Sequence, residues 1–245
     1  MKLLVDIGNT ATKIGLLNKE LIYIGRLYNR AINLDSIKEV LKEVTNFKIE
    51  EILISSVAPK VFITLSDIFY QLFKVSVELI DVNTKVDFGI EIDNRNELGV
   101  DLLCDLVAAD KLYGPKTAVI DFGTATKVLF INKDNIFSSC AIFLGYEASK
   151  KILANSTELL PDVGNIKIKN ISDCHNTVDV INSSAYYSQL FTVNGIIEKF
   201  EKEVGYKMKR AYTGGNAIDF LSEIKKENYD EFLVLKGLAI LAERK

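Results

Sequence analysis

The segment Leu3–Leu17, LLVDIGNTATKIGLL, decides how the rest of the chain is interpreted. An apolar run ends at Asp6, a turn over residues 8–10 follows, and a second apolar run begins at Ile14. This pattern predicts a strand, a tight turn and a second strand. A carboxylate at the end of a buried strand, followed by glycine and hydroxyl residues, is typical of a loop that binds phosphate and a metal ion. Because turns favour Asp, Gly and Asn for conformational reasons alone, a plain hairpin is the alternative at this point.

A second copy of the pattern lies about half a chain later. Ala118–Ile131 reads AVIDFGTATKVLFI, so that Thr124–Lys127 repeats the four residues Thr10–Lys13, each time just after Asp-x-Gly. Such a repeat indicates two domains of one ancestral design. We expect an N-terminal domain over residues 1–115 and a C-terminal domain over residues 116–245, whose two turns hold a nucleotide from either side.

Composition and charge argue against several classes of protein. A chain of 245 residues can bury two separate cores. The net charge of −3 provides no basic face for nucleic acid. No apolar run approaches the about 18 residues that a membrane span needs, and the N-terminus lacks the pattern of a signal peptide. Three widely spaced cysteines predict reduced core thiols. We therefore expect a cytoplasmic enzyme that binds neither nucleic acid nor membrane.

The order of the expected elements predicts an α/β fold. Strands are expected at residues 3–5, 12–17, 20–27, 51–55, 77–80, 117–120, 127–131, 136–140 and 208–212, and helices at 34–45, 61–73, 101–113, 146–154, 177–204 and 232–244. The layout resembles the ribonuclease H-like half of the actin-like sugar kinase superfamily. That resemblance implies two ribonuclease H-like (actin-like ATPase) domains, with mixed sheets flanked by helices and a nucleotide cleft between the domains.

Seven short motifs follow one another along the chain: Asp6-Ile7-Gly8-Asn9-Thr10, Ser56-Val57-Ala58-Pro59, Leu98-Gly99-Val100-Asp101, Asp121-Phe122-Gly123-Thr124-Ala125-Thr126, Asn176-Thr177, Thr213-Gly214-Gly215 and Leu235-Lys236-Gly237-Leu238. In order and spacing, this series resembles the type III pantothenate kinases over essentially the whole chain. The resemblance implies an ATP-dependent enzyme that phosphorylates the small molecule pantothenate in the first step of coenzyme A biosynthesis. It also implies a homodimer, a requirement for Mg²⁺ and a monovalent cation, K⁺ or NH₄⁺.

The resemblance assigns roles position by position. It makes Asp101 the general base, Asp6 a ligand of Mg²⁺ and Asp121 the ligand of the monovalent cation. The nucleotide-binding residues would be Asp6, Ile7, Gly8, Asn9, Thr10, Ala11, Thr12, Lys13, Gly123 and Thr124. The substrate-binding residues would be Ile92, Gly99, Val100, Asp101, Leu102 and Thr177. These residue types suit phosphoryl transfer, which needs positioning, charge neutralisation and one carboxylate to accept a proton. Without the resemblance, a simple helix N-cap is the preferred interpretation of Asp101.

Several positions depart from the family pattern. Ile92 replaces a Tyr, Arg95 a Pro, Leu102 an Arg that helps hold the substrate carboxylate, Lys127 the Thr that ends a Thr-Ala-Thr-Thr run, and Leu144 a Pro. The change at Leu102 matters most, because a buried carboxylate without its partner costs roughly 2–5 kcal/mol.

Three hypotheses follow from the departures. The chain is a pantothenate kinase in which Arg95 replaces the missing Arg, a kinase for a small alcohol without a carboxylate, or a catalytically idle ATP-binding regulator. Retention of Asp6, Asp101 and Asp121 favours an active enzyme, because an idle site has no need of three carboxylates near phosphate.

Overall fold

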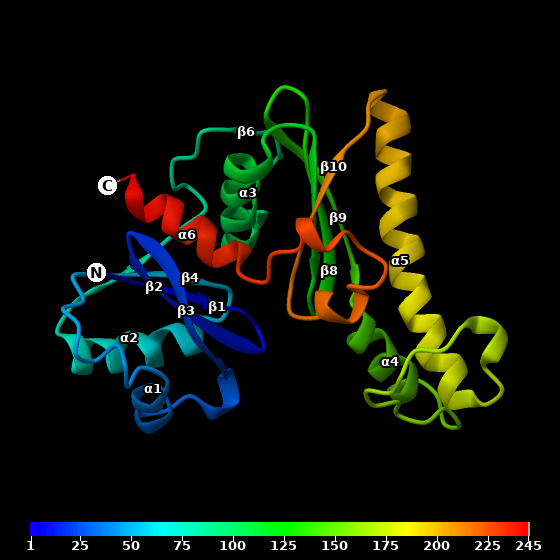
Figure 1. The fold of residues 1–245 in the computed structure, drawn as a ribbon, viewed down its shortest axis with the longest axis horizontal. Helices are drawn as coiled ribbons and strands as arrows, with labels where there is room; N and C mark the ends of the chain where they lie inside the picture. The colour runs from blue at the N-terminus through cyan, green and yellow to red at the C-terminus, as the bar shows by residue number, and fades with distance from the viewer. Residues whose placement is uncertain (245) are drawn as a thin grey trace. The chain divides into compact units, whose positions relative to one another are not determined.

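The computed structural model describes residues 1–244 and divides the chain into two compact units (Figure 1). Unit 1 comprises Met1–Gly114 together with the C-terminal segment that begins at Phe232, and unit 2 comprises Pro115–Glu231. This corrects the expected C-terminal domain over residues 116–245. The last helix, α6 (Leu233–Glu243), packs within unit 1 against α3 (Val100–Tyr113).

Unit 1 is built on a mixed sheet with the strand order β3-β2-β1-β4-β5. Its strands are β1 (Lys2–Ile7), β2 (Ala11–Asn18), β3 (Glu20–Tyr28), β4 (Glu51–Ser56) and β5 (Val77–Leu79), and the short β6 (Gly89–Ile90) precedes α3. β1, β2 and β3 are antiparallel neighbours, whereas β4 and β5 run parallel to β1. The remaining helices of unit 1 are α1 (Leu34–Val40), α2 (Pro59–Phe73) and the 3₁₀ turns η1 (Asn29–Ala31) and η2 (Arg95–Glu97).

The two faces of this sheet have different partners. Side chains alternate between the faces along a strand. Leu3, Val5 and Ile7 of β1 therefore share one face, where they pack in a core with residues of α1 and α2. The other face carries Asp6 and is covered by α3 and α6 (Figure 1). The alternation thus places the carboxylate of Asp6 beside α3.

Unit 2 repeats the plan, with the strand order β10-β7-β8-β9. Its strands are β7 (Thr117–Phe122), β8 (Ala125–Ile131), β9 (Ile136–Leu144) and β10 (Lys209–Thr213). β7, β8 and β9 are antiparallel neighbours and β10 runs parallel to β7, as β4 does to β1. Its helices are α4 (Tyr146–Asn155) and α5 (Thr177–Val204), with 3₁₀ turns η3 (Ile171–Asp173), η4 (Ala217–Phe220) and η5 (Lys226–Asn228). The α/β fold class and the internal repeat are confirmed.

The core of unit 2 lies between its sheet and α5. Ile120 and Phe122 of β7 pack in one cluster with Tyr186 and Leu190 of α5. Asp121 alternates with these residues and therefore lies on the opposite face of the sheet. Asp6 in unit 1 and Asp121 in unit 2 thus occupy equivalent positions. Each lies near the end of the first strand of its unit, on the sheet face opposite the core formed by the neighbouring apolar residues of that strand.

The three cysteines differ in burial. Cys104 is buried in α3, Cys174 is partly buried and Cys140 is exposed. The prediction of core thiols is right for Cys104 and wrong for Cys140, because Cys140 lies on β9, a strand whose side chains are largely exposed. Across residues 1–244, no helix combines the length and the apolar character that a membrane crossing requires.

Candidate functional site

The first predicted phosphate loop is the turn between β1 and β2, and Asn29 holds it in place. The side-chain amide of Asn29 donates to the carbonyl oxygens of Gly8 at 2.8 Å and Asn9 at 3.1 Å, and its backbone N–H donates to that of Thr10 at 3.0 Å. The hydroxyl of Thr12 donates to the Oδ1 of Asn29 at 2.9 Å. A single residue from the end of β3 therefore fixes the conformation of the turn.

These contacts orient the backbone of the turn. In a planar trans peptide the N–H points opposite to the C=O. Because the carbonyls of Gly8 and Asn9 face Asn29, the N–H groups of Asn9 and Thr10 point away from it, and both residues are exposed. Successive backbone N–H groups of this kind form an anion-binding concavity. The turn therefore has the geometry to bind phosphate oxygens.

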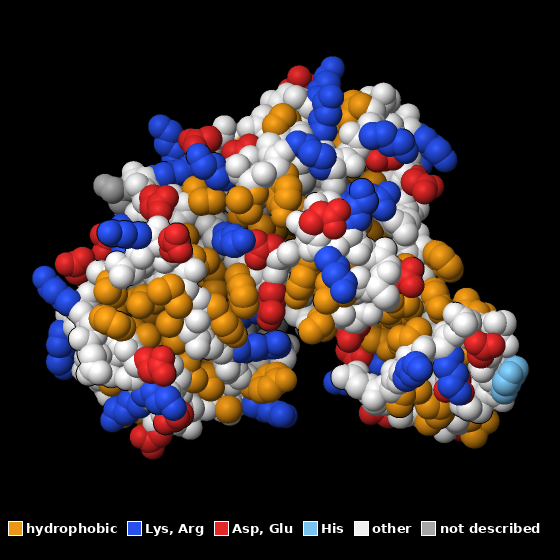
Figure 2. All heavy atoms as spheres, in the orientation of Figure 1, with side chains coloured by type: hydrophobic (Ala, Val, Ile, Leu, Met, Phe, Trp, Pro, Cys, Tyr) orange, Lys and Arg blue, Asp and Glu red, His pale blue; other side chains and the backbone are white. Residues whose placement is uncertain are grey.

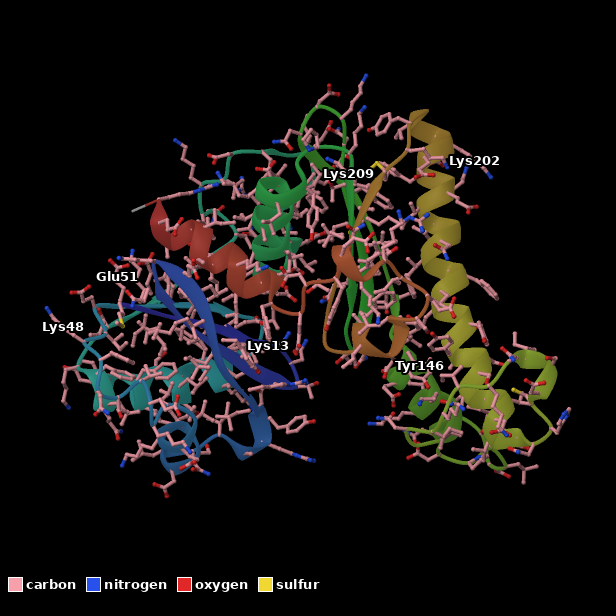
Figure 3. All side chains as sticks on the ribbon, viewed as in Figure 1. Lys13, Lys48, Glu51, Tyr146, Lys202 and Lys209 are labelled. Atoms are coloured by element: carbon pink, nitrogen blue, oxygen red, sulfur yellow. The ribbon has the colours of Figure 1, made fainter. Side chains whose placement is uncertain are left out.

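Asp6 ends β1 beside this turn. It lies directly opposite Lys13 of β2 and Ser55 of β4 in the strand register, and Lys13 is labelled in Figure 3. Directly opposite residues share one face of a sheet. The carboxylate of Asp6 is buried, with 8% of the residue exposed. Ile7 and Ala11 complete the predicted loop, with Ile7 in the core.

The structure gathers three carboxylates of unit 1 around Cys104. Burial, and then the nearby carboxylates of Asp6, Asp105 and Asp101, raise the pKa of the Cys104 thiol well above its usual value, while a hydrogen bond with Ser55 opposes the shift. The thiol is therefore protonated at neutral pH. The carboxylates of Asp6, Asp101 and Asp105 therefore all act on one buried thiol, and we refer to them as the acidic site of unit 1.

Asp101 lies in the first turn of α3, but it is not the N-cap. The N-cap is Gly99, and the Oδ1 of Asp101 accepts a hydrogen bond from the backbone N–H of Leu102 at 2.9 Å. A Cβ on Gly99 would overlap that same oxygen. Glycine therefore makes room for the carboxylate at the start of the helix. The interpretation of Asp101 as a simple N-cap is wrong.

The other predicted substrate residues of unit 1 lie on α3 or in the segment that precedes it. Leu102 is buried in α3, Val100 begins the helix, and Ile92 is partly buried in the segment before η2. Arg95 donates from Nε to the carbonyl oxygen of Val82 at 2.6 Å and from Nη2 to that of Thr84 at 3.3 Å. These contacts make Arg95 an anchor of residues 82–84, which argues against its replacing the missing Arg.

The second predicted phosphate loop, between β7 and β8, is held in the same way by Asn216. Its backbone N–H donates to the carbonyl oxygen of Phe122 at 2.9 Å, and its side-chain amide donates to that of Gly123 at 3.1 Å. By the same peptide geometry, the N–H groups of Gly123 and Thr124 point away from Asn216. Both turns of the repeat thus present backbone N–H groups outward under the control of an asparagine.

Gly145 supports the second turn from its other side. Its N–H donates to the carbonyl oxygen of Thr124 at 3.0 Å. A Cβ at this position would lie 2.7 Å from that oxygen and closer still to the carbonyl oxygen of Gly123. Only glycine allows this approach. Leu144, which replaces the Pro of the family pattern, accepts a hydrogen bond from Gln189 through its carbonyl at 2.7 Å.

Asp121 forms an ion pair within unit 2. The Nζ of Lys127 lies 2.8 Å from the Oδ2 of Asp121, and the two residues are directly opposite each other on β7 and β8. Thr213 of β10 lies opposite Asp121 on the other side. The arrangement matches that of Asp6, which lies between Lys13 and Ser55. The repeat therefore places each aspartate between a lysine and a hydroxyl residue.

Thr177 lies at the start of α5, next to a groove of about 820 Å³ that Leu144, Lys150 and Val180 also line. Lys150 is buried, and its Nζ contacts the carboxylate of Glu147 at 2.8 Å and the side-chain oxygen of Asn182 at 3.3 Å. Tyr146, labelled in Figure 3, donates to the same oxygen at 2.5 Å. The groove is therefore backed by a buried, hydrogen-bonded polar network.

A small charged cluster holds the start of α5. The side chain of Asn176 caps the helix by accepting from the N–H of Asp179 at 2.9 Å. Lys169 donates to the Oδ2 of Asp179 at 2.6 Å, and this hydrogen bond holds the pKa of Asp179 below its usual value despite the opposing effect of burial. The cluster fixes Thr177 at one end of the groove.

Within residues 1–244, no group of three or more His, Cys, Asp or Glu side chains is arranged to hold a metal. Mg²⁺ in phosphoryl-transfer sites typically uses one or two carboxylates, with water and substrate phosphates as the other ligands. The buried carboxylate of Asp6 beside the first turn fits that requirement.

Sequence reasoning missed the residues that support the two turns. Neither Asn29 nor Asn216 was assigned a role from the sequence. Asn29 follows β3 directly, and Asn216 follows β10 after two glycines. An asparagine just after a strand is a usable signal, since its amide can satisfy turn carbonyls. Gly145 received no role either, although its neighbour Leu144 was identified as a departure from the family pattern. The close approach of Gly145 to Thr124 has no local sequence signal.

Comparison with known proteins places this site in context. The family model for type III pantothenate kinase matches residues 2–199. A type III pantothenate kinase of Sulfurihydrogenibium is 32% identical over 98% of this chain and 99% of its own length. One of Halalkalibacterium halodurans is 30% identical over 100% of this chain and 99% of its own. An archaeal actin homologue of known structure, 12% identical, aligns with a TM-score of 0.50 over 100% of this chain and 99% of that one, which bears on the fold alone.

Proposed function

The chain belongs to the type III pantothenate kinase family, and on this premise we propose that it transfers the terminal phosphoryl group of ATP to the hydroxyl of pantothenate. The bond between the terminal phosphorus and its bridging oxygen breaks, a bond from the pantothenate oxygen to phosphorus forms, and ADP leaves. The products are ADP and 4'-phosphopantothenate, the first intermediate on the route to coenzyme A.

We assign phosphate binding to the asparagine-held turn that each unit carries. The N–H groups of Asn9 and Thr10 in unit 1, and of Gly123 and Thr124 in unit 2, are oriented for phosphate oxygens. Donors that are fixed before the substrate arrives lose little freedom on binding, which favours stabilisation of the charge that develops during transfer. Asp6 would hold Mg²⁺, which would neutralise phosphate charge when bound.

Asp101 is the proposed general base. Its carboxylate is held beside Gly99 at the start of α3. It would accept the proton of the pantothenate hydroxyl as the oxygen attacks phosphorus. The residues of unit 1 that we assign to the substrate are Ile92, Gly99, Val100 and Leu102, and in unit 2 we assign Thr177 to it as the family resemblance implies.

The observation that carries the proposal is the acidic site of unit 1. The clamped turn follows Asp6 along the chain, and the carboxylates of Asp6 and Asp101 both act electrostatically on the buried thiol of Cys104. This arrangement combines a phosphate-binding turn, a metal ligand and a base, which are the parts that phosphoryl transfer needs.

A coupled assay of ADP release with pantothenate tests the proposal. We expect turnover with pantothenate and much weaker turnover with the analogue in which a hydroxymethyl group replaces the carboxylate. Preference for the carboxylate-free analogue would assign the enzyme to another small alcohol, in keeping with the apolar Leu102. Binding of ATP without turnover across a wide range of alcohols would contradict a kinase and favour a regulator.

We also propose that the enzyme is a homodimer joined through unit 2. Figure 2 shows apolar side chains gathered around α4 and the first turns of α5. Ile152 of α4 and Val180 of α5 are each 46% exposed, and Phe191, further along α5, is 65% exposed. Burial of such side chains against a second copy is favourable at about 25 cal/mol per Å². Sedimentation equilibrium is expected to give a dimer and Phe191→Glu to weaken it, whereas a monomer at all concentrations would contradict the proposal.

The place of action that we propose is the cytoplasm. Cys104, Cys140 and Cys174 are all free thiols in the structure. Free thiols are the usual state in a reducing compartment. Fractionation of cells that express the protein would test this assignment.

A further inference from the structure

We propose that the ammonium group of Lys127 permanently supplies the positive charge at Asp121, so that this enzyme works without a free monovalent cation. The inference rests on the proposed function for its catalytic consequence. The structural basis of the inference is the ion pair between Lys127 and Asp121 within unit 2. The family resemblance implies that Asp121 would otherwise bind K⁺ or NH₄⁺.

The ion pair is set by the sheet. Asp121 of β7 and Lys127 of β8 are directly opposite each other in an antiparallel register, and the Nζ of Lys127 lies 2.8 Å from the Oδ2 of Asp121. The side chain of Asp121 is only 14% exposed, and that of Lys127 is 20% exposed. β8 lies between β7 and β9, so its backbone is held on both sides. The lysine is therefore tethered to the carboxylate by the fold rather than by chance contact at the surface.

The other oxygen of the carboxylate is also enclosed. A Cβ on Gly214 would overlap the Oδ1 of Asp121, and one on Gly123 would lie 3.6 Å from it. The backbone of these two glycines therefore closes around Oδ1 while Lys127 covers Oδ2. A free cation that approached this carboxylate would also meet the positive charge of the ammonium a few ångströms away, which is repulsive.

The chemistry of the replacement is matched. The lysine side chain ends in an ammonium with three N–H donors. NH₄⁺ is one of the two cations that the family resemblance implies, and the ammonium of Lys127 is the same kind of group on a carbon stem. A tethered group competes with free ions at an effective concentration on the order of millimolar or more. The residue that the family has here, threonine, carries no charge and leaves the carboxylate to a soluble ion.

Nucleotide binding and thermal stability test the inference without reference to the acceptor. The affinity for an ATP analogue and the Tm are measured in about 0.1 M KCl and in choline chloride at the same ionic strength, so that screening is equal. For the natural protein we expect less than a twofold change in affinity and no shift in Tm. For Lys127→Thr we expect binding at least tenfold weaker in choline, with recovery in KCl or NH₄Cl.

A matched control separates the site from general loss of an ion pair. Lys207 pairs with the buried Glu201 at 2.6 Å elsewhere in unit 2. Lys207 is 87% exposed, so Lys207→Thr removes a lysine–carboxylate pair at the surface of the same unit and should create no cation dependence. Lys127→Gln, which keeps the length of the side chain but not the charge, provides a second variant if the threonine variant folds poorly.

Two results would overturn the inference. One is a tenfold or larger gain in affinity of the natural protein on adding K⁺, which needs no variant at all. The other is cation-independent nucleotide binding by the folded Lys127→Thr and Lys127→Gln proteins. If pantothenate is not turned over but the binding pattern is as expected, the proposed function fails while the assignment of Lys127 stands.

Discussion

Replacing Gly237 by alanine tests the packing that joins the C-terminal helix to unit 1. Gly237 is buried on α6, where a Cβ would lie 2.6 Å from the carbonyl carbon of Cys104 and 2.8 Å from its Cα, and closer still to its carbonyl oxygen. These are backbone atoms of α3 and cannot rotate away. In a close-packed interior, α3 and α6 must therefore move apart by roughly 1 Å.

The size of the effect follows from that displacement. Forcing an additional methyl group into a packed core costs typically about 1–3 kcal/mol. For a unit the size of unit 1, a loss of about 2 kcal/mol lowers the Tm by roughly 5–10 °C. Because Cys104 lies beside Asp6 and Asp101, we also expect weaker nucleotide binding.

Scanning calorimetry of Gly237→Ala gives the measurement, and Gly195→Ala is the matched control. Gly195 is an exposed residue inside α5, and a Cβ there would meet nothing within 4 Å. The same substitution should therefore stabilise unit 2 by about 0.5–1 kcal/mol, since glycine is a poor helix former. A Tm of Gly237→Ala equal to or above that of the natural protein would refute the close approach of α6 to α3.

Three further results are expected. Asp101→Asn should lower kcat by about 10²–10⁴ with little change in ATP affinity, because a general base is lost while the turns remain. If single-turnover assays gave a rate within threefold of the natural enzyme, Asp101 would not be the base. Asn29→Ala deletes the side-chain hydrogen bonds to Gly8, Asn9 and Thr12, each worth about 0.5–1.5 kcal/mol. Calorimetry should show binding of an ATP analogue weakened at least tenfold. Unchanged affinity would mean that the turn keeps its shape without these hydrogen bonds. The hydrogen bond from Lys169 lowers the pKa of Asp179 in the folded protein below its ordinary value of 3.8. The stability that this hydrogen bond contributes is therefore present above pH 3.8 and is lost as the pH falls through the folded pKa. Asp179→Asn should therefore be less stable than the natural protein at pH ~7 and approach it below pH ~4, and a Tm difference that stays constant across this range would contradict the assignment.

The fold and the ends of many elements were accessible from the sequence because they depend on neighbouring residues. Alternation of apolar residues predicts the strands around Asp6 and Asp121, and the turn residues between them predict the two hairpins. The asparagine before Thr177 predicts where α5 begins, and its cap is present. Each of these signals acts over a few residues.

The supporting contacts of the site were not accessible in the same way. Asn29 reaches back to Gly8, and Asn216 reaches to Gly123, across segments whose separation no local pattern encodes. The role of Gly145 depends on its hydrogen bond to Thr124, a contact between two separate segments of the chain. In each case the strand order and register choose the partner, and these are properties of the whole sheet.

Two hairpins that each carry an aspartate, an α/β repeat and the family resemblance can be predicted from short stretches of sequence, since turn chemistry and period-two burial are local. The packing of α6 within unit 1, the support of the turns by Asn29 and Asn216, and the pairing of Lys127 with Asp121 across two strands emerge only from the folded chain. A side chain's partner depends on which backbones pack together. Burial of apolar surface drives that packing without specifying in advance which polar groups it will bring together.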